Sequence, residues 1–240
     1  MGSSKYISVN FDEYVSESVE SDIKSNKEAK RVYNKIKRNI QEVKLEPTHN
    51  DFITDSKGNR HPLNGVKFNL TEIGEKYDLE ILLANSIKGA NPHYSSSENR
   101  IVFFIISQTG DPHNFELNSH FARLRFSTWV DEIVFIHEFI HFLDNNRYGN
   151  TYSYSDAQSL TSYYNSPEEY NAHTQEIITH ILKNKAKFAK LPFQMFLKKA
   201  VGLGGEFVAK LDADYTRKLE KRLYKLHTEL NKMSEKAYKK

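Results

Sequence analysis

The sequence predicts an α+β fold in which a small β-sheet is combined with a buried helix and with further helices at both ends of the chain. Short runs of β-favouring residues lie ahead of residue 107. The apolar run from Trp129 to Leu143 has the length of a helix and contains two histidines and a glutamate. Apolar residues also recur at helical spacing before residue 47 and after residue 200.

The composition is that of a globular protein without a membrane span. Of the 240 residues, 38% are hydrophobic and 27% are charged, and no apolar run approaches the roughly 20 residues that cross a bilayer. Cysteine is absent, so any metal must be bound by histidine and carboxylate. The first residues lack the apolar segment of a secretory signal, which predicts a cytoplasmic protein or one carried by a virion or a secretion system. Richness in Lys, Asn, Ile, Tyr and Phe favours a bacterial or phage source.

Residues 1–46 are expected to form an N-terminal helical extension. Ile23, Val32 and Ile36 belong to an apolar pattern that suits one or two amphipathic helices. Pro47 has no backbone N–H and ends the segment.

Three strands are predicted next, each beside a cluster of turn residues. They are Val66 to Leu70, Leu79 to Ile87 and Arg100 to Ile106. The first follows the turn signal Asp55 to Asn59. Residues 107 to 127 are rich in loop-forming residues and are expected to form a loop.

Two central helices are predicted from the spacing of apolar residues and from capping residues. The first is predicted over Thr128 to Leu143 and ends at the polar run Asn145 to Asn150. The second begins at Ser166, an N-cap residue, and has Pro167 in its first turn, where a missing N–H costs nothing.

The last third of the chain is predicted to be helical. Phe193 to Ala200 is an apolar helix that Gly202 to Gly205 should break. We expect residues 47–200 to form the main domain and residues 201–240 a basic amphipathic helix that docks on it or associates with another helix. The apolar stripe of that helix consists of Tyr215, Leu219, Leu223, Leu226, Leu230 and Met233.

The run His137-Glu138-Phe139-Ile140-His141 is an HExxH motif inside the first central helix. Positions four apart share one helix face, so both imidazoles can bind one metal ion, and Glu138 lies beside its open position. Polar groups in such an apolar segment need partners, and a zinc ion supplies them. We therefore predict one Zn²⁺ per chain, bound by His137 and His141.

A catalytic zinc usually has a third protein ligand, which should follow His141. A third histidine six residues on, as in metzincins, is excluded because that position is Arg147. Glu169, in the first turn of the second central helix, is the best candidate, and Glu168 is the fallback because it lies about 100° round the same helix. The other available side chains are Asp156, His173 and His180.

These residues resemble the gluzincin group of zinc peptidases, whose third ligand is a glutamate on a second helix. The most similar family is that of the anthrax lethal factor catalytic domain and related toxin or phage metallopeptidases, which has HEFGH and then a Leu-Thr-Ser-Tyr run before its ligand Glu. This chain has Leu160-Thr161-Ser162-Tyr163 ahead of Glu169. The likeness covers roughly residues 90 to 185. It departs at Ile140, where the family has Gly, and in a Tyr-to-Glu spacing that is one residue shorter.

The resemblance implies a zincin-like fold and a zinc-dependent endopeptidase acting on a protein or peptide substrate. Glu138 would be the general base, and Tyr163 or Tyr164 would donate a hydrogen bond to the oxyanion. Asp144 and Glu176 are candidates for orienting a ligand histidine, although Asp144 equally suits a plain polar residue at the C-terminal end of its helix. Arg100 to Ile106 would be the substrate-aligning edge strand, although its apolar run suits a core strand equally.

Two other functions compete with peptide hydrolysis. A non-catalytic interaction or virion protein could keep a zincin-like fold and use its terminal helices for docking, but it would have no need of Glu138. Nucleic acid binding through the basic C-terminal segment is disfavoured, because the net charge is only +3 and few aromatic residues lie among its lysines.

Overall fold

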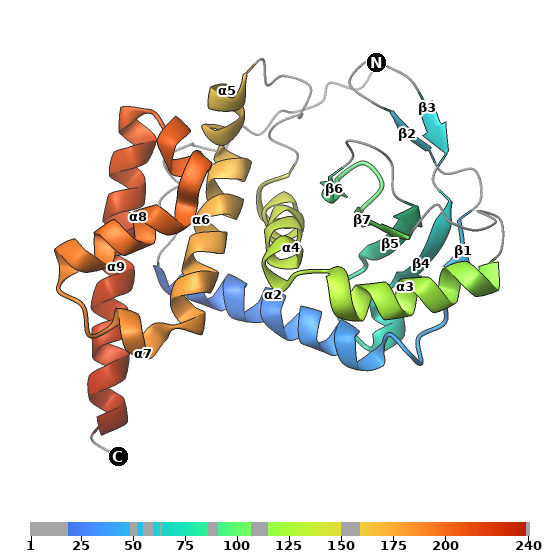
Figure 1. Cartoon of the computed structure of the whole chain (residues 1–240), viewed down its shortest axis with the longest axis horizontal. Coiled ribbons are helices and arrows are strands. Elements are labelled where there is room, and N and C mark those ends of the chain that lie inside the picture. The colour runs from blue at the N-terminus through green and yellow to red at the C-terminus, as the bar shows by residue number, and fades with distance from the viewer. Residues whose placement is uncertain are drawn as a thin grey trace. The chain divides into compact units, whose positions relative to one another are not determined.

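The computed structural model describes residues 19–48, 52–54, 60–62, 64–85, 91–106, 115–149 and 159–238. They form the predicted α+β fold, with a five-stranded mixed sheet and helices before and after it (Figure 1). Contacts divide the chain into two compact units, residues 27–142 and residues 1–26 with 143–240. The division into 1–46, 47–200 and 201–240 stays a prediction. Among the described helices, none has the length and apolar character that crossing a membrane requires.

The three predicted strands are confirmed as β4 (Gly65–Asn69), β5 (Glu80–Asn85) and β7 (Arg100–Ile106). The sheet order is β1-β4-β5-β7-β6, with β1 (Glu46–Pro47) and β6 (His93–Ser95) at its edges. β5 and β7 are parallel, and the other pairs are antiparallel. A separate two-stranded sheet pairs β2 (Phe52–Thr54) with β3 (Arg60–Pro62).

β7 is an internal strand, so the expectation that Arg100 to Ile106 forms the edge of the sheet is wrong. It hydrogen-bonds to β5 on one side and to β6 on the other. The other expectation, that this segment is a core strand, is confirmed, since Ile101, Val102 and Phe103 are buried. The edge belongs to β6, whose three residues are too short a run for sequence periodicity to reveal.

Residues 107 to 127 do not form the expected loop throughout, because α3 spans Phe115–Trp129. Its buried residues Asn118, Ala122 and Phe126 are four apart, which makes one stripe along the helix. The helix α3 lies against β4 and β7 (Figure 1), and the ring of Phe126 in this stripe contacts that of Phe103 of β7 at a centroid distance of 6.0 Å. Only two of its three members are apolar, so the pattern in the sequence is weak and tertiary packing stabilises the helix.

The motif helix α4 spans Glu132–Tyr148, so it begins and ends about four residues later than predicted. Asp131 caps its start by accepting a hydrogen bond from the N–H of Ile133 at 2.6 Å. At its end Gly149 has φ 77° and donates to the carbonyl of Asn145, as glycine commonly does after a helix.

One face of α4 is a row of buried phenylalanines: Phe135, Phe139 and Phe142. Their rings contact aromatic rings of neighbouring elements at centroid distances of 5.3 to 6.2 Å, which suits edge-to-face and offset packing. This aromatic packing fixes the rotation of α4 about its axis. The partner rings are those of Tyr33 in α2 (Val19–Asn39), Tyr77, Tyr94 in β6 and Phe103 in β7.

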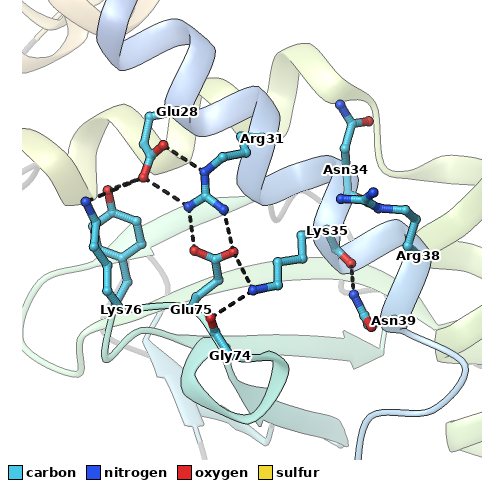
Figure 2. A network of polar contacts seen from close by, with 10 residues as sticks. Glu28, Arg31, Asn34, Lys35, Arg38, Asn39, Gly74, Glu75 and Lys76 are labelled. Atoms are coloured by element: carbon cyan, nitrogen blue, oxygen red, sulfur yellow. Dashed lines mark hydrogen bonds and ion pairs between the residues drawn. The ribbon is translucent and has the colours of Figure 1, made fainter.

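The predicted N-terminal helix is α2, which spans Val19–Asn39. Figure 2 shows its second half bound to the segment after the 3-10 helix Leu70–Ile73. Arg31 makes two hydrogen bonds to the Glu75 carboxylate, at 2.7 and 2.5 Å, and also binds Glu28. The Arg31 guanidinium lowers the pKa of Glu28 to about 2 and also lowers that of Glu75.

The second unit is a helical core. α6 (Pro167–Lys183), α8 (Phe193–Lys210) and α9 (Ala213–Tyr238) lie side by side (Figure 1), and the short α7 (Lys185–Phe188) joins them. The Gly-rich break is a kink inside α8, where Gly205 has φ 50° and ψ −124°. Five residues of the apolar stripe of α9 belong to one buried cluster with residues of α6 and α8, whereas Met233 is 40% exposed. The five are Tyr215, Leu219, Leu223, Leu226 and Leu230. Association of α9 with a partner stays a prediction.

A network of buried polar side chains crosses this helical core. Arg222 of α9 binds both carboxylate oxygens of Asp22 of α2 and donates to the side-chain oxygen of Asn171 at 2.5 Å. Asn171 donates in turn to Asp144 of α4 at 2.6 Å. All four side chains belong to residues that are at most 8% exposed, so these polar groups would be costly without one another. Gln175 extends the network by donating to Asp22 at 3.0 Å.

We expect Arg222→Ala to lower the free energy of unfolding by about 3 to 5 kcal/mol, because it leaves the buried Asp22 carboxylate without its cation. Arg217→Ala is the matched control, since Arg217 lies on the same helix and pairs with the exposed Asp214. Its effect should stay below about 1 kcal/mol. Urea unfolding followed by circular dichroism measures both, and equal losses would show that the buried network adds no stability.

We expect the Glu28 ion pair to stabilise the fold at neutral pH and to fail in acid. The pKa of Glu28 falls from 4.5 to about 2 on folding, so its contribution is complete above pH 4.5 and is lost as the pH falls towards 2. Glu28→Gln should therefore lower the free energy of unfolding by roughly 1 kcal/mol at pH 6, and the difference should shrink by pH 3. Exposed Glu116 is the control, and a difference independent of pH would contradict the assignment.

Candidate metal centre

His137 and His141 lie on the side of α4 away from its phenylalanines. They are two residues on from Phe135 and Phe139, a rotation of about 200° round the helix. Their Nε2 atoms face each other at 3.1 Å. Two nitrogens bound to one tetrahedral zinc at about 2.05 Å would be roughly 3.3 Å apart, so the observed spacing suits a shared ion.

Glu138 is buried at 6% exposure, and its Oε2 accepts a hydrogen bond from the backbone N–H of Tyr94 at 2.8 Å. Tyr94 is the middle residue of the edge strand β6, paired with Ile101 of β7. The N–H that binds Glu138 therefore does not bond to β7. The carboxylate next to the first motif histidine is fixed by the outer edge of the sheet.

The predicted start of α6 is confirmed. Ser166 accepts a hydrogen bond from the N–H of Glu169, and Pro167 is the first helical residue. Glu169 is thereby held in the first turn, with its side chain 12% exposed. His173 follows one turn later, and its Nε2 lies 3.7 Å from Oε2 of Glu169.

His137, Glu169 and His173 form a group that could hold a metal ion. Each offers one ligand atom, and these atoms all lie within 4.8 Å of one another. Two imidazoles and a carboxylate are a donor set that zinc and other borderline transition metals accept. The metal-binding character expected from the sequence thus has a geometric basis, while the identity of the metal rests on donor chemistry alone.

The predicted ligands differ from this group in one member. His137 and Glu169 belong to it, whereas the second imidazole of the group is His173 in place of His141. The Nε2 atom of His141 lies 3.1 Å from that of His137. Glu168 is not in the group formed by the described residues. The assignments of His141 and Glu169 as ligands stay predictions.

The structure describes only some of the other positions that the sequence offered for a third ligand. His180 lies eleven positions beyond Glu169 on α6, roughly 16 Å along the helix. Asp156 lies outside the described residues. Arg147, at the metzincin position, donates to the hydroxyl of Ser25 at 3.0 Å, which gives this side chain a structural partner.

Tyr163 and Tyr164 lie on the short helix α5 (Leu160–Tyr164), and both rings approach His173. The centroid of Tyr164 is 5.1 Å and that of Tyr163 is 6.3 Å from the imidazole centroid. Burial raises the pKa of Tyr164, and nearby carboxylates, Glu206 first among them, raise it further. The phenol of Tyr164 is therefore a protonated donor at neutral pH. The role of either tyrosine in catalysis stays a prediction.

The two expected orienting carboxylates have identified partners. Glu176 Oε2 lies 3.2 Å from Nδ1 of His173, so it contacts an imidazole of the metal group, as expected of an orienting residue. Asp144 accepts from Asn171 at 2.6 Å. Sequence reasoning did not single out Asn171 or Arg222. The sequence signal for Asn171 was weak. It is a polar residue between Tyr170 and Ala172, one helical turn before the polar Gln175.

We found no match to this chain among models of known protein families, curated proteins or solved structures. The residues of the site therefore carry the functional argument without support from a relative.

We expect the chain purified without chelator to contain close to one equivalent of zinc, measured by plasma mass spectrometry. Glu169→Ala should reduce the content below about half an equivalent, because it removes the carboxylate that is predicted to bind the metal. Glu168→Ala is the matched control on the adjacent position and should retain the metal. The reverse pattern would move the ligand to Glu168, and zinc-free wild-type protein would contradict the metal centre.

Proposed function

We propose that this chain is a zinc-dependent endopeptidase with His137, His141 and Glu169 as metal ligands and Glu138 as general base. The observation that carries the proposal is the arrangement on α4. Two imidazole nitrogens face each other at 3.1 Å, and a buried carboxylate directly follows the first of them. A site that only stores or structurally uses a metal has no need of that carboxylate.

Zinc bound at such a site lowers the pKa of its water to about 7 and polarises a carbonyl oxygen. The protein side chains supply the rest of the chemistry. Glu138 accepts the proton of the attacking water and delivers it to the nitrogen of the leaving amine. Tyr163 or Tyr164 donates a hydrogen bond to the developing oxyanion, and the raised pKa of Tyr164 keeps its proton available for this.

The edge strand β6 provides a place for a peptide substrate. The side of β6 away from β7 can pair with an extended peptide by β-strand addition. The donor on that side is the N–H of Tyr94, which here binds Glu138. A peptide carbonyl that accepts from Tyr94 releases the Glu138 carboxylate from that bond. Substrate binding and the freeing of the base are thus linked through one backbone N–H.

We expect Glu138→Gln to reduce peptide turnover by about 10² to 10⁴-fold while the metal content stays at the wild-type value, because glutamine keeps the shape and loses the proton acceptor. A peptide library analysed by mass spectrometry gives the turnover. Glu132→Gln is the matched control, an identical change on the same helix at a residue paired with Lys30. Its turnover should equal that of the wild type.

Two outcomes would remove the case for catalysis. One is equal cleavage by the wild type and Glu138→Gln, and the other is cleavage by neither protein when both contain metal. The second outcome would favour the alternative function, a non-catalytic zincin-like interaction or virion protein in which the metal stabilises the fold.

A further inference from the structure

The side of α9 opposite its buried leucines carries a row of cations. Arg217, Lys221 and Lys225 are four residues apart, so they lie on one side of the helix at intervals of about 6 Å. Lys232 continues the row about two turns further on, and all four residues are exposed. These four residues are called the basic stripe. Within the described parts of the chain, Lys221 and Lys225 have no ion-pair partner.

A surface pocket of about 320 Å³ lies beside the basic stripe, between α9 and the first turn of α2. Both walls belong to the unit formed by residues 1–26 and 143–240. Pockets that bind small molecules have volumes from about 300 Å³ upward, so this one has room for a ring system. Its lining includes Glu20, Tyr224, Lys225, Thr228, Glu229 and Lys232.

Tyr224 gives the pocket an aromatic wall. It lies between Lys221 and Lys225 in the sequence, on the same side of α9, and is 57% exposed. Phe193 of α8 meets its ring edge to face at a centroid distance of 5.1 Å. The ring therefore has a packing partner at the surface while more than half of the residue stays open to solvent.

The pocket also contains two carboxylates. Glu229 binds the ammonium group of Lys232 at 2.6 Å. Its carboxylate is the main cause that raises the pKa of Lys232, and Glu20 of α2 adds to the same shift. Carboxylate oxygens accept hydrogen bonds and cannot donate them. The pocket thus offers acceptors beside an aromatic ring, with the cations of the basic stripe running past it.

This combination distinguishes between anionic ligands. An acidic peptide suits the basic stripe, but Glu20 and Glu229 repel its carboxylates. A nucleotide has an anionic phosphate, a flat base that stacks on tyrosine and, in several bases, an exocyclic amine that donates to a carboxylate. The sequence disfavours nucleic acid because few aromatic residues lie among the C-terminal lysines. The fold, however, exposes one of them, Tyr224, within the basic stripe.

We propose that this surface binds single-stranded nucleic acid, with a base against the Tyr224 ring and the phosphate backbone along the basic stripe. Proteins that bind single strands combine a basic track for the backbone with aromatic side chains for the bases. A single strand, unlike a duplex, has bases that are free to enter a pocket. The proposed peptide hydrolysis makes no use of this surface, so the two proposals stand or fail separately.

Fluorescence anisotropy of a fluorescein-labelled oligodeoxycytidylate of about 12 nucleotides tests the proposal on the full chain. We expect the wild type to bind it with a dissociation constant below about 100 μM at about 50 mM salt, and more weakly as the salt concentration rises. Tyr224→Ala should weaken binding about tenfold, since it removes the stacking partner. Tyr224→Phe keeps the ring and should bind as the wild type does.

The cations have their own readout in the salt dependence. Lys221→Gln and Lys225→Gln should each weaken binding and reduce the slope of log affinity against log salt concentration by about 0.7, the value for one phosphate contact on a single strand. Lys198→Gln is the matched control, an exposed lysine on α8 outside the basic stripe. It should leave both the affinity and the slope unchanged.

Three results would overturn the proposal. The first is a wild type that leaves the anisotropy unchanged up to about 100 μM protein. The second is a Tyr224→Ala variant that binds like the wild type, or a Lys198→Gln variant that loses as much affinity as Lys221→Gln, since either would show attraction to diffuse charge. The third is equal competition by a polyglutamate of the same length, which would assign the basic stripe to acidic proteins.

Discussion

The guanidinium of Arg222 is buried in the helical core, and the hydrogen bonds that begin with it connect four helices. It binds Asp22 of α2 and Asn171 of α6, and Asn171 binds Asp144 of α4. An apolar contact tolerates sliding of one helix along another. A planar guanidinium bonded to a carboxylate and an amide has a narrow range of geometries. The network therefore sets the register of α6 and the C-terminal half of α4.

That register matters because the proposed metal ligands are close to the network along the chain. Asn171 is two residues after Glu169, and Asp144 is three residues after His141. At the other end of α4, the phenylalanine row fixes the rotation of the helix. Apolar packing thus determines which way the motif histidines face, and polar bonding determines where the glutamate-bearing helix lies along its own axis.

The sequence predicted those features that short-range signals encode. The HExxH motif, the capped start of α6 at Ser166 and the apolar run of β7 were visible because each depends on neighbouring residues. The helix α3 was missed because its buried stripe includes a polar residue, Asn118, and its stability comes from the sheet beneath it. The edge strand β6 was missed because its three residues are too few to show the alternation of polar and apolar residues that marks a strand.

The candidate metal site was also predicted only in part, because some of its contacts join residues far apart in the sequence. The motif and the spacing predicted His137, His141 and Glu169 as candidates. The position of the His173 ring depends instead on Phe207, which belongs to another helix and lies just after the kink at Gly205. The sequence did contain one local signal for His173. It is four residues after Glu169 and three before Glu176, so on a helix its side chain lies between two carboxylates. The bond from Arg222 to Asp22 joins residues 200 positions apart, and no local pattern predicts it.

That separation bears on how the protein matures during its synthesis. The motif histidines and Glu169 leave the ribosome well before Arg222 does, and until then Asp22 and Asn171 have no cation to gather them. A nascent chain therefore has the donors of the site before it has their fixed arrangement. The buried network, and with it the register of α6, is therefore complete only after α9 has been synthesised.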